Sequence, residues 1–299
     1  MAAGNGRVAV VTGASSGIGK ETARALAASG WHVIATGRDP ARSAAAAEDI
    51  RAASVGGRVD MLVADLSLLA EAARLARDIA AITPRVDVLI NNAGGMANGL
   101  VMTAEGYEAN FAGNHLGPFL LTNRLMPLLR AAAATAPLGS VRIINTASDA
   151  SEMIPTLNLD DMQNLGNYSN GLAYCSGKLA NVLFARALAG RLAGDGIVAH
   201  AMHPGAVDSR FFDDIDAEAR ARVRDLPKVS VAEGADTLIW LATAEEPGRS
   251  SGLYWHKRAL RAPNPVVEDS AFVARFWDES ERLVARAGVQ VAIHGDAHA

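Results

Sequence analysis

The stretch from Arg7 to Gly30 begins Arg7-Val8-Ala9-Val10-Val11-Thr12-Gly13-Ala14-Ser15-Ser16-Gly17-Ile18-Gly19 and continues with a helical pattern. An apolar run that meets glycines and opens directly into a helix predicts a strand, a tight turn and a helix N-terminus. Unpaired backbone N–H groups and the helix dipole at such an N-terminus attract phosphate. The glycine spacing is G-x-x-x-G-x-G, which differs from the common dinucleotide-binding pattern G-x-G-x-x-G. The order of strand, glycine-rich turn and helix N-terminus is nevertheless the same. We therefore predict a dinucleotide site, against the alternative that the glycines serve only as turn residues.

Apolar runs typical of strands recur along the chain, with helical patterns between them. After Val8–Val11 they lie at His32–Thr36, Val59–Ala64, Val86–Asn91, Val141–Thr146, Ile197–Met202 and Gly252–Trp255. This alternation implies βαβ units, whose right-handed crossovers give a parallel sheet with helices on both faces. No Pro/Gly/Ser-rich linker interrupts the pattern. We predict one α/β domain over residues 1–299, a Rossmann-type, doubly wound, mostly parallel sheet of seven strands.

Composition limits the partners that the protein can have. The chain has 299 residues, 50% of them hydrophobic, and a formal net charge of −4 with its 28 basic residues scattered. Such a balance argues against a nucleic-acid surface and favours a small-molecule partner. The single cysteine, Cys175, excludes an intramolecular disulfide, and no Cys/His cluster has the spacing of a zinc site. Residues 1–6 resemble no signal peptide and no apolar run is long enough to span a membrane, so we expect a cytoplasmic location.

The residues with the clearest chemistry are Tyr174 and Lys178, in Tyr174-Cys175-Ser176-Gly177-Lys178. Residues four apart share a helix face, so the phenol and the ammonium can point at one small volume. A phenol has a pKa near 10, and a nearby cation lowers it, which makes Tyr174 usable as a general acid/base. Asn114 is an amide in an apolar helix and needs a partner. Ser148 ends a strand without a G-x-S-x-G elbow, which favours hydrogen bonding over nucleophilic attack.

Together with Asn91-Asn92-Ala93-Gly94, these motifs resemble the short-chain dehydrogenase/reductase family. The stretch from Gly171 to Phe184, with Asn114-His115-Leu116-Gly117, is most similar to the retinol dehydrogenase and WW-domain oxidoreductase branch. The resemblance implies that an alcohol and a ketone or aldehyde, on a hydrophobic small molecule, are interconverted with NAD(P)(H). It implies four catalytic residues: Asn114, Ser148, Tyr174 and Lys178. The competing interpretation is a nucleotide-binding regulatory or interaction protein without catalysis.

The resemblance also implies a set of cofactor contacts spread along the chain. They are Gly13, Ser15, Ser16, Gly17, Ile18, Gly19, Arg38, Asp65, Leu66, Asn92, Ala93, Gly94, Tyr174, Lys178, Pro204, Gly205, Val207 and Ser209. Asp65 could equally be a helix N-cap. Arg38 offers donors for the 2′-phosphate of NADP, whereas the neighbouring Asp39 could accept from the ribose 2′-OH of NAD. In the resembled family the acid of NAD-users usually stands where this chain has Gly37. We predict NADP(H), with NAD(H) as the alternative, because Arg38 presents a planar fork of donors suited to phosphate.

Two further expectations concern the surroundings of the site. The segments 149–170 and 210–229 contain apolar residues among polar ones, and we expect them to cover the substrate, with surface packing as the alternative. The resemblance also implies a homodimer or homotetramer, built from the helices that follow the fourth and fifth strands. The Ala-rich face from Leu179 to Leu192 would suit that interface, and it would equally suit an internal core.

Overall fold

The computed structural model describes residues 6–208 and 227–288, and its centre is one twisted sheet. The strands lie side by side in the order β10-β9-β6-β5-β4-β1-β2-β3, and all neighbouring pairs are parallel except β9–β10. Their bounds are β1 Val8–Val11, β2 His32–Gly37, β3 Val59–Val63, β4 Val88–Asn91, β5 Val141–Thr146, β6 Ile197–His203, β9 Leu253–His256 and β10 Ala259–Leu260. A separate parallel pair joins β7, Ala206–Val207, to β8, Lys228–Val229.

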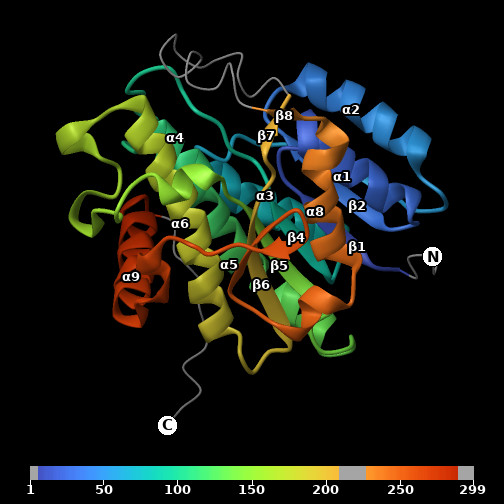
Figure 1. Ribbon diagram of the computed structural model, residues 1–299. Coiled ribbons are helices and arrows are strands. Elements are labelled where there is room, and N and C mark those ends of the chain that lie inside the picture. Colours follow the sequence, from blue (N-terminus) through green and yellow to red (C-terminus); the bar gives the residue numbers. More distant parts are fainter. Residues whose placement is uncertain (1–5, 209–226, 289–299) are drawn as a thin grey trace.

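Helices cover both faces of this sheet, as the alternating pattern predicts (Figure 1). One face carries α1 Gly17–Ala28, α2 Pro40–Ala53 and α8 Val231–Thr243. The other carries α3 Leu69–Ile82, α4 Ala109–Phe111, α5 Gly117–Ala133, α6 Asn170–Arg191 and α9 Ser270–Arg286. Apolar side chains form one buried cluster on each face. The doubly wound α/β class is therefore confirmed.

The strand count differs from the prediction, because the sheet has eight strands rather than seven. After β9 the chain turns through Lys257 and Arg258, both with positive φ (50° and 59°), and returns as β10. A two-residue turn of this kind usually shows Asn-Gly or Gly-Gly in the sequence. Here the turn is fastened to α8 instead, since Arg258 forms an ion pair with Asp236 and donates its backbone N–H to Thr237 Oγ1 (3.2 Å). Without a glycine signal, the sequence did not reveal the last strand.

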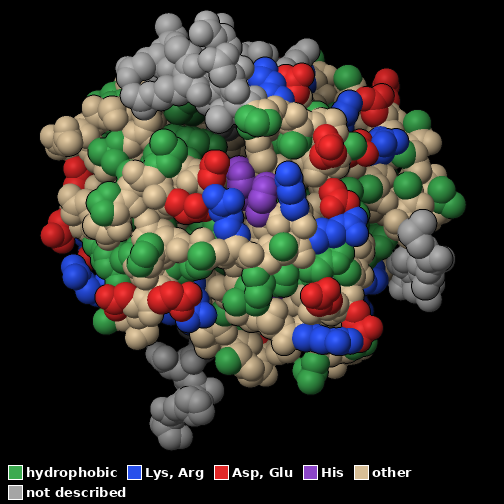
Figure 2. Space-filling view, viewed as in Figure 1, with side chains coloured by type: hydrophobic (Ala, Val, Ile, Leu, Met, Phe, Trp, Pro, Cys, Tyr) green, Lys and Arg blue, Asp and Glu red, His purple; other side chains and the backbone are tan. Residues whose placement is uncertain are grey.

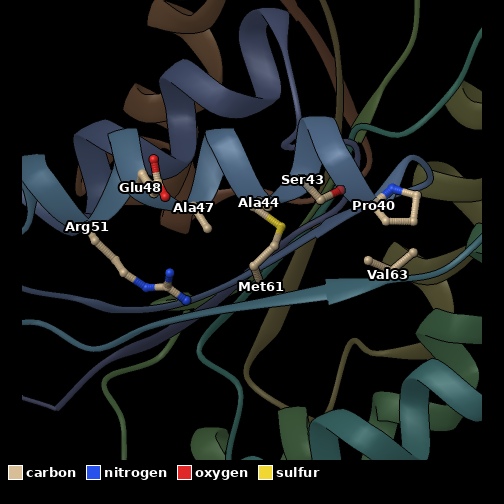
Figure 3. A pocket seen from close by; sticks show the side chains of 8 residues that line it. All are labelled: Pro40, Ser43, Ala44, Ala47, Glu48, Arg51, Met61 and Val63. Atoms are coloured by element: carbon tan, nitrogen blue, oxygen red, sulfur yellow. The ribbon is translucent and has the colours of Figure 1, made fainter.

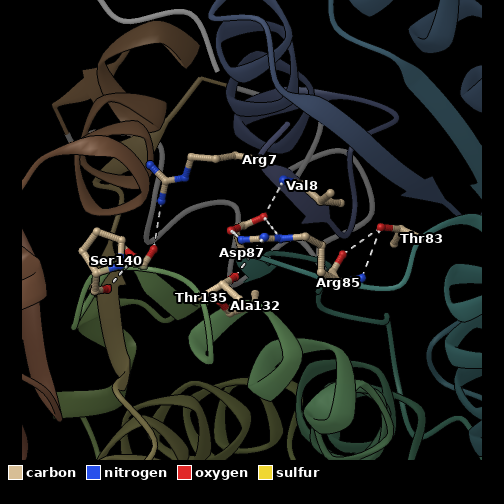
Figure 4. A network of polar contacts seen from close by, with 9 residues as sticks. Arg7, Val8, Thr83, Arg85, Asp87, Ala132, Thr135 and Ser140 are labelled. Atoms are coloured by element: carbon tan, nitrogen blue, oxygen red, sulfur yellow. Dashed lines mark hydrogen bonds and ion pairs between the residues drawn. The ribbon is translucent and has the colours of Figure 1, made fainter. Parts of the chain in front are cut away.

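At the amino-terminal end of the parallel strands, a buried carboxylate joins two segments (Figure 4). Asp87 is 2% exposed, accepts the backbone N–H of Val8 at 2.8 Å and pairs with Arg85 Nη2 at 2.5 Å. Arg7 donates to the carbonyl of Ser140 from the same region. These bonds hold the start of β1 against the chain that enters β4, at the edge opposite the glycine-rich turn.

Candidate functional site

The glycine-rich turn has the shape that its sequence predicts. Gly13 and Gly17 have φ of +66° and +56°, a region that other residues rarely adopt. A Cβ on Gly13 would lie 2.8 Å from Cα of Ala93, and one on Gly19 would lie 2.3 Å from Nδ2 of Asn92. Glycine is therefore required at Gly13 for its conformation and at both positions for close contact with the end of β4.

The N-terminus of α1 is open at its first turn. Ser16 is the N-cap residue, but its side chain caps no backbone N–H within the described part of the chain, and the first turn holds no acidic residue. An α-helix leaves its first N–H groups without intrahelical partners, and these groups attract an anion. The donor set thus fits the diphosphate of a dinucleotide. Ile18 lies beside Val207, since a Cβ on Gly234 would contact the γ-methyl groups of both.

Asn92 ties the end of β4 to this turn. Its Nδ2 donates to the carbonyls of Thr12 (2.9 Å) and Gly13 (3.3 Å), while Thr12 Oγ1 accepts from the backbone N–H of Asn92 and of Ala93, each at 3.0 Å. Thr12 is a residue that the sequence analysis did not select, although it directly precedes Gly13. The two loops that face the predicted cofactor are held as one unit.

At the end of β2, close packing excludes a side chain. A Cβ on Gly37 would lie 2.3 Å from Ser43 Oγ and 2.8 Å from Ser15 Cβ. Asp39 is the N-cap of α2 and accepts the backbone N–H of Arg42 at 2.8 Å, and this bond holds the pKa of Asp39 below its usual value. Arg38 is exposed, and no hydrogen bond or ion pair connects it to any described residue. The acid is thus engaged by the helix, and the arginine is available to a ligand.

Asp65 and Leu66 follow β3, as expected. Asp65 Oδ1 accepts from the backbone N–H and the hydroxyl of Ser67, at 3.0 and 2.8 Å. Neither Asp65 nor Ser67 caps α3. The N-terminal N–H groups of that helix, on Leu69 and Ala70, are bound instead by the carboxylate of Glu105, which lies 35 residues further along the chain.

Asn114 lies in a π-helical turn, Ala112–Leu116, between α4 and α5. Its Nδ2 donates to the carbonyls of Gly95 and Asn110, both at 2.8 Å, so the buried amide is satisfied. A Cβ on Gly177 would lie 3.1 Å from Asn114 Cβ, and one on Gly94 would lie 2.5 Å from Asn114 Oδ1. π-Bulges are frequent at functional sites, because they reorient part of the helix. Here the bulge brings Asn114 against both α6 and the end of β4.

Tyr174 and Lys178 share one face of α6, as their spacing predicts. Lys178 Nζ lies 5.6 Å from the centre of the Tyr174 ring and donates to the carbonyl of Thr146 at 3.2 Å. Lys178 is 4% exposed, and burial lowers its pKa to about 8. Burial raises the pKa of Tyr174, and a hydrogen bond with Ser148 opposes that rise. The tyrosine ring itself remains partly exposed at the site.

The sequence analysis did not select Thr146 and Asn181, which form hydrogen bonds beside Lys178. The carbonyl of Thr146 accepts from Lys178 and also from Asn181 Nδ2 at 3.0 Å. Asn181 in turn accepts, through its backbone carbonyl, a hydrogen bond from Asn145 Nδ2 at 3.3 Å. The polar positions in β5 and their spacing from Lys178 were visible, but the contact depends on how α6 lies against the sheet.

The loop after β6 lies at the same edge of the sheet. Gly205 has φ of +89°, and Val207 in β7 pairs with Val229 in β8. Pro204 precedes this turn and is half-buried. Ser209, the last predicted cofactor contact, lies outside the described residues.

The segment 149–170 is only partly superficial. Leu157, Leu159 and Met162 are buried in the core, whereas Met153 is 70% exposed. Asn164 donates from Nδ2 to Ser176 Oγ at 3.0 Å, which fixes the segment to α6 beside Tyr174. Most of the segment 210–229, including Phe211, Phe212 and Leu226, lies outside the described residues.

A pocket of about 310 Å³ lies between α2 and β3 (Figure 3). Its lining residues are Pro40, Ser43, Ala44, Ala47, Glu48, Arg51, Met61 and Val63. None of these belongs to the predicted catalytic or cofactor-binding residues, although Pro40 and Val63 each stand two positions from a predicted cofactor contact, Arg38 and Asp65.

An anion-binding helix N-terminus and a Tyr/Lys pair at the same edge of a parallel sheet define a class, that of nicotinamide-dependent oxidoreductases. The model of the short chain dehydrogenase family matches residues 7–220. The chain belongs to this family, and within it to the retinol dehydrogenase-like branch. It is an NAD(P)-dependent oxidoreductase that acts on an alcohol or carbonyl group.

Similar proteins support this membership over nearly the whole chain. Human retinol dehydrogenase 13 is 37% identical over 287 residues, covering 93% of this chain and 85% of the relative. Mouse polyprenol dehydrogenase is 35% identical over 288 residues, covering 95% and 85%. Among solved structures, an uncharacterised protein from Mycobacterium paratuberculosis has a TM-score of 0.74 at 29% identity, covering 96% of this chain and 95% of that one. The Pseudomonas aeruginosa RhlG/NADP complex has a TM-score of 0.67 at 29% identity, covering 85% and 96%.

Across residues 6–208 and 227–288, no helix combines the length and the apolar character that a bilayer crossing requires.

Proposed function

We propose that Tyr174, Lys178, Ser148 and Asn114 carry out the alcohol–carbonyl interconversion and that the substrate is a hydrophobic small molecule. The observation that carries the proposal is the convergence of these four side chains from α6, the segment just after β5 and the π-helical turn. When bound, the nicotinamide cofactor supplies or accepts the hydride. Tyr174 exchanges the proton with the substrate oxygen, and Lys178 stabilises its phenolate form. Ser148 orients the substrate oxygen and Asn114 supports a water near Lys178.

The test is Tyr174→Phe, which removes the hydroxyl and keeps the ring. We expect turnover to be lost while cofactor binding, followed by fluorescence, is largely kept. Retinol, 1-octanol and the corresponding aldehydes are suitable probes, because relatives are named retinol and polyprenol dehydrogenases. Near-normal turnover by the Phe variant would refute the assignment. Tight cofactor binding by the wild type without hydride transfer to any probe would favour the regulatory alternative.

We also propose NADP(H) as the preferred cofactor. Three observations support it: a side chain at Gly37 has no room, the Asp39 carboxylate caps α2, and Arg38 is exposed. Arginine presents a planar set of donors that suits a phosphate. Ser16 stands where many NADP-users carry a basic residue, so the preference rests on Arg38. Titrating the wild type with NADPH and NADH tests the proposal without any substrate, and tighter binding of NADH would overturn it.

The cofactor contacts follow from the same proposal. The turn residues Gly13–Gly19 would hold the diphosphate. Asp65, Leu66 and Asn92–Gly94 would line the adenosine half. Pro204, Gly205, Val207 and Ser209 would surround the nicotinamide.

Domain organisation and assembly remain predictions. We propose a single domain in which the segments 149–170 and 210–229 cover the substrate. A homodimer or homotetramer is still predicted, although the face of α6 from Leu179 to Leu188 is buried within the chain, partly against α9. An interface would therefore need another surface, and sedimentation of a 31 kDa monomer at micromolar concentration would refute the prediction.

The single cysteine supports a cytoplasmic location, which cell fractionation can test.

A further inference from the structure

The Ser148 hydroxyl has hydrogen bonds to three neighbours, Tyr174, Asp149 and Ala150. Ser148 Oγ donates its proton to Asp149 Oδ1 at 3.0 Å and accepts the backbone N–H of Ala150 at 3.2 Å. Ser148 also shares a hydrogen bond with the hydroxyl of Tyr174. A serine hydroxyl has one proton and two acceptor sites. That proton lies toward Asp149 while Tyr174 is neutral and can turn to the Tyr174 oxygen once Tyr174 is ionised, which is how the bond with Ser148 lowers the pKa of Tyr174. The hydrogen bonds therefore form a continuous chain from Tyr174 through Ser148 to Asp149.

A buried histidine holds Asp149 in this position. The backbone N–H of Asp149 donates to His203 Nδ1 at 3.2 Å, and Asp149 Oδ2 lies 3.7 Å from His203 Nε2. Since Nδ1 accepts a hydrogen bond, the neutral ring carries its proton on Nε2, facing the carboxylate. His203 is 7% exposed, its ring is stacked on His256 with centroids 4.6 Å apart, and burial lowers its pKa to about 4. The imidazole is therefore a fixed neutral support for Asp149.

The carboxylate of Asp149 faces water, unlike Lys178. The Asp149 side chain is 56% exposed, whereas Lys178 is 4% exposed and directed at the carbonyl of Thr146. Figure 2 shows histidine side chains near the centre of the face in view, with acidic and basic side chains close to them. Four ionisable groups interact electrostatically with Asp149: His203 of β6, Tyr254 of β9, Arg261 after β10 and Tyr174 of α6. Glu152 lies on the same 3₁₀ turn as Asp149.

We propose that Asp149 ends a proton path, Tyr174–Ser148–Asp149, that connects the reacting oxygen with water. This inference rests on the proposed role of Tyr174 and adds a residue that acts through Ser148. In alcohol oxidation, the O–H bond of the substrate breaks and an O–H bond forms on the Tyr174 phenolate. That proton then passes to Ser148 Oγ as the original Ser148 proton moves to Asp149 Oδ1, and Asp149 releases it to water. Only protons move along this path, and in carbonyl reduction they move in reverse.

The experiment compares Asp149→Asn with the wild type and with Glu152→Gln, a matched control. In Asp149→Asn the amide keeps the size of the side chain but cannot take up a proton as a carboxylate does. Glu152 is a suitable control because it pairs with Arg261 (2.6 Å) and has no hydrogen bond to Ser148 in the described structure. We expect Asp149→Asn to slow oxidation of retinol or 1-octanol about tenfold, with an increased solvent deuterium isotope effect. Added formate should restore part of the rate, because it replaces the missing proton acceptor. Glu152→Gln should behave as the wild type.

The outcomes separate this path from the proposed function. Wild-type turnover, an unchanged isotope effect and no formate response in Asp149→Asn would overturn the path, even if Tyr174→Phe is inactive. Turnover by Tyr174→Phe would overturn the proposed function itself. If no probe is oxidised, the pKa of Tyr174 can be measured instead from the absorbance of tyrosinate as the pH is raised. The part of this absorbance that is missing from Tyr174→Phe belongs to Tyr174. Asp149→Asn should then lower the pKa of Tyr174, since it removes both a negative charge and the acceptor that orients Ser148, and an unchanged pKa would contradict the path.

Discussion

Lys178 Nζ lies 5.6 Å from the centre of the Tyr174 ring, and its hydrogen bond goes to the carbonyl of Thr146 rather than to the phenol. In the proposed mechanism the ammonium therefore acts on Tyr174 through its charge and not by a hydrogen bond. A buried cation at this distance favours the phenolate, because the low-dielectric surroundings screen the attraction weakly.

Replacing Lys178 by Met should remove this charge and keep most of the side-chain volume. We expect turnover to fall at least about 100-fold, because the phenolate then loses its neighbouring cation while burial still raises the pKa of Tyr174. Cofactor affinity should also fall if Lys178 holds the nicotinamide ribose. Steady-state rates and fluorescence titration measure both effects. Lys257→Met, on the exposed β9–β10 turn, is the control and should stay near wild type.

Replacing Arg38 by Ala should change cofactor preference. A charge-assisted contact with the 2′-phosphate contributes about 1.5–3 kcal/mol, so the Kd of NADPH should rise roughly ten- to a hundredfold. The Kd of NADH should change little, since NADH lacks that phosphate. Arg24→Ala removes an exposed arginine that pairs with Glu21 and should affect neither cofactor. Equal losses for NADPH and NADH would contradict the predicted role of Arg38.

Replacing Asp87 by Asn should destabilise the fold without touching the site. The carboxylate is 2% exposed and bonds both Val8 N–H and Arg85 (Figure 4). Loss of the charge leaves Arg85 without its close partner and weakens the tie to β1. We expect the free energy of unfolding to fall by about 2–4 kcal/mol, measured by urea denaturation. Asp49→Asn, which breaks an exposed pair with Lys20, should leave stability nearly unchanged.

His115 should make the protein sensitive to acid. Its ring is fully buried among Phe111, Phe119, Phe184 and Phe276, and burial lowers its pKa to about 3. In the unfolded chain a histidine titrates near 6.5, so between about pH 6.5 and 3 only the unfolded state binds this proton. Stability should therefore fall as the pH drops through this window, by about 1.4 kcal/mol per pH unit for this group.

The variant His115→Leu tests this effect, since leucine cannot titrate. Its free energy of unfolding should depend less steeply on pH than that of the wild type once the pH falls below the ordinary histidine range. Above neutral pH the two curves should run parallel, which provides an internal control. Parallel curves at all pH values would show that His115 does not contribute.

Much of the site was predictable because its signals are local. Gly13 and Gly17 mark a turn by their conformational freedom, and the short apolar run that meets this turn predicts a buried strand. Tyr174 and Lys178 share a helix face because of their spacing alone. The alternation of strands and helices then brings the carboxyl ends of the parallel strands to one edge, so these local signals converge.

Other features were decided only by the tertiary structure. The N–H groups of α3 are capped by Glu105, which no local pattern connects with that helix. His203 supports Asp149 across 54 residues of chain, and the face of α6 that would suit an oligomer interface is instead core, partly under α9. By itself the sequence determined most of the strands and helices, though not β10, and the residue types that the site contains, because these follow from local conformational preference and periodicity. Which side chain satisfies a given buried donor, acceptor or apolar face depends on contacts between distant segments, and these exist only once the layers have packed.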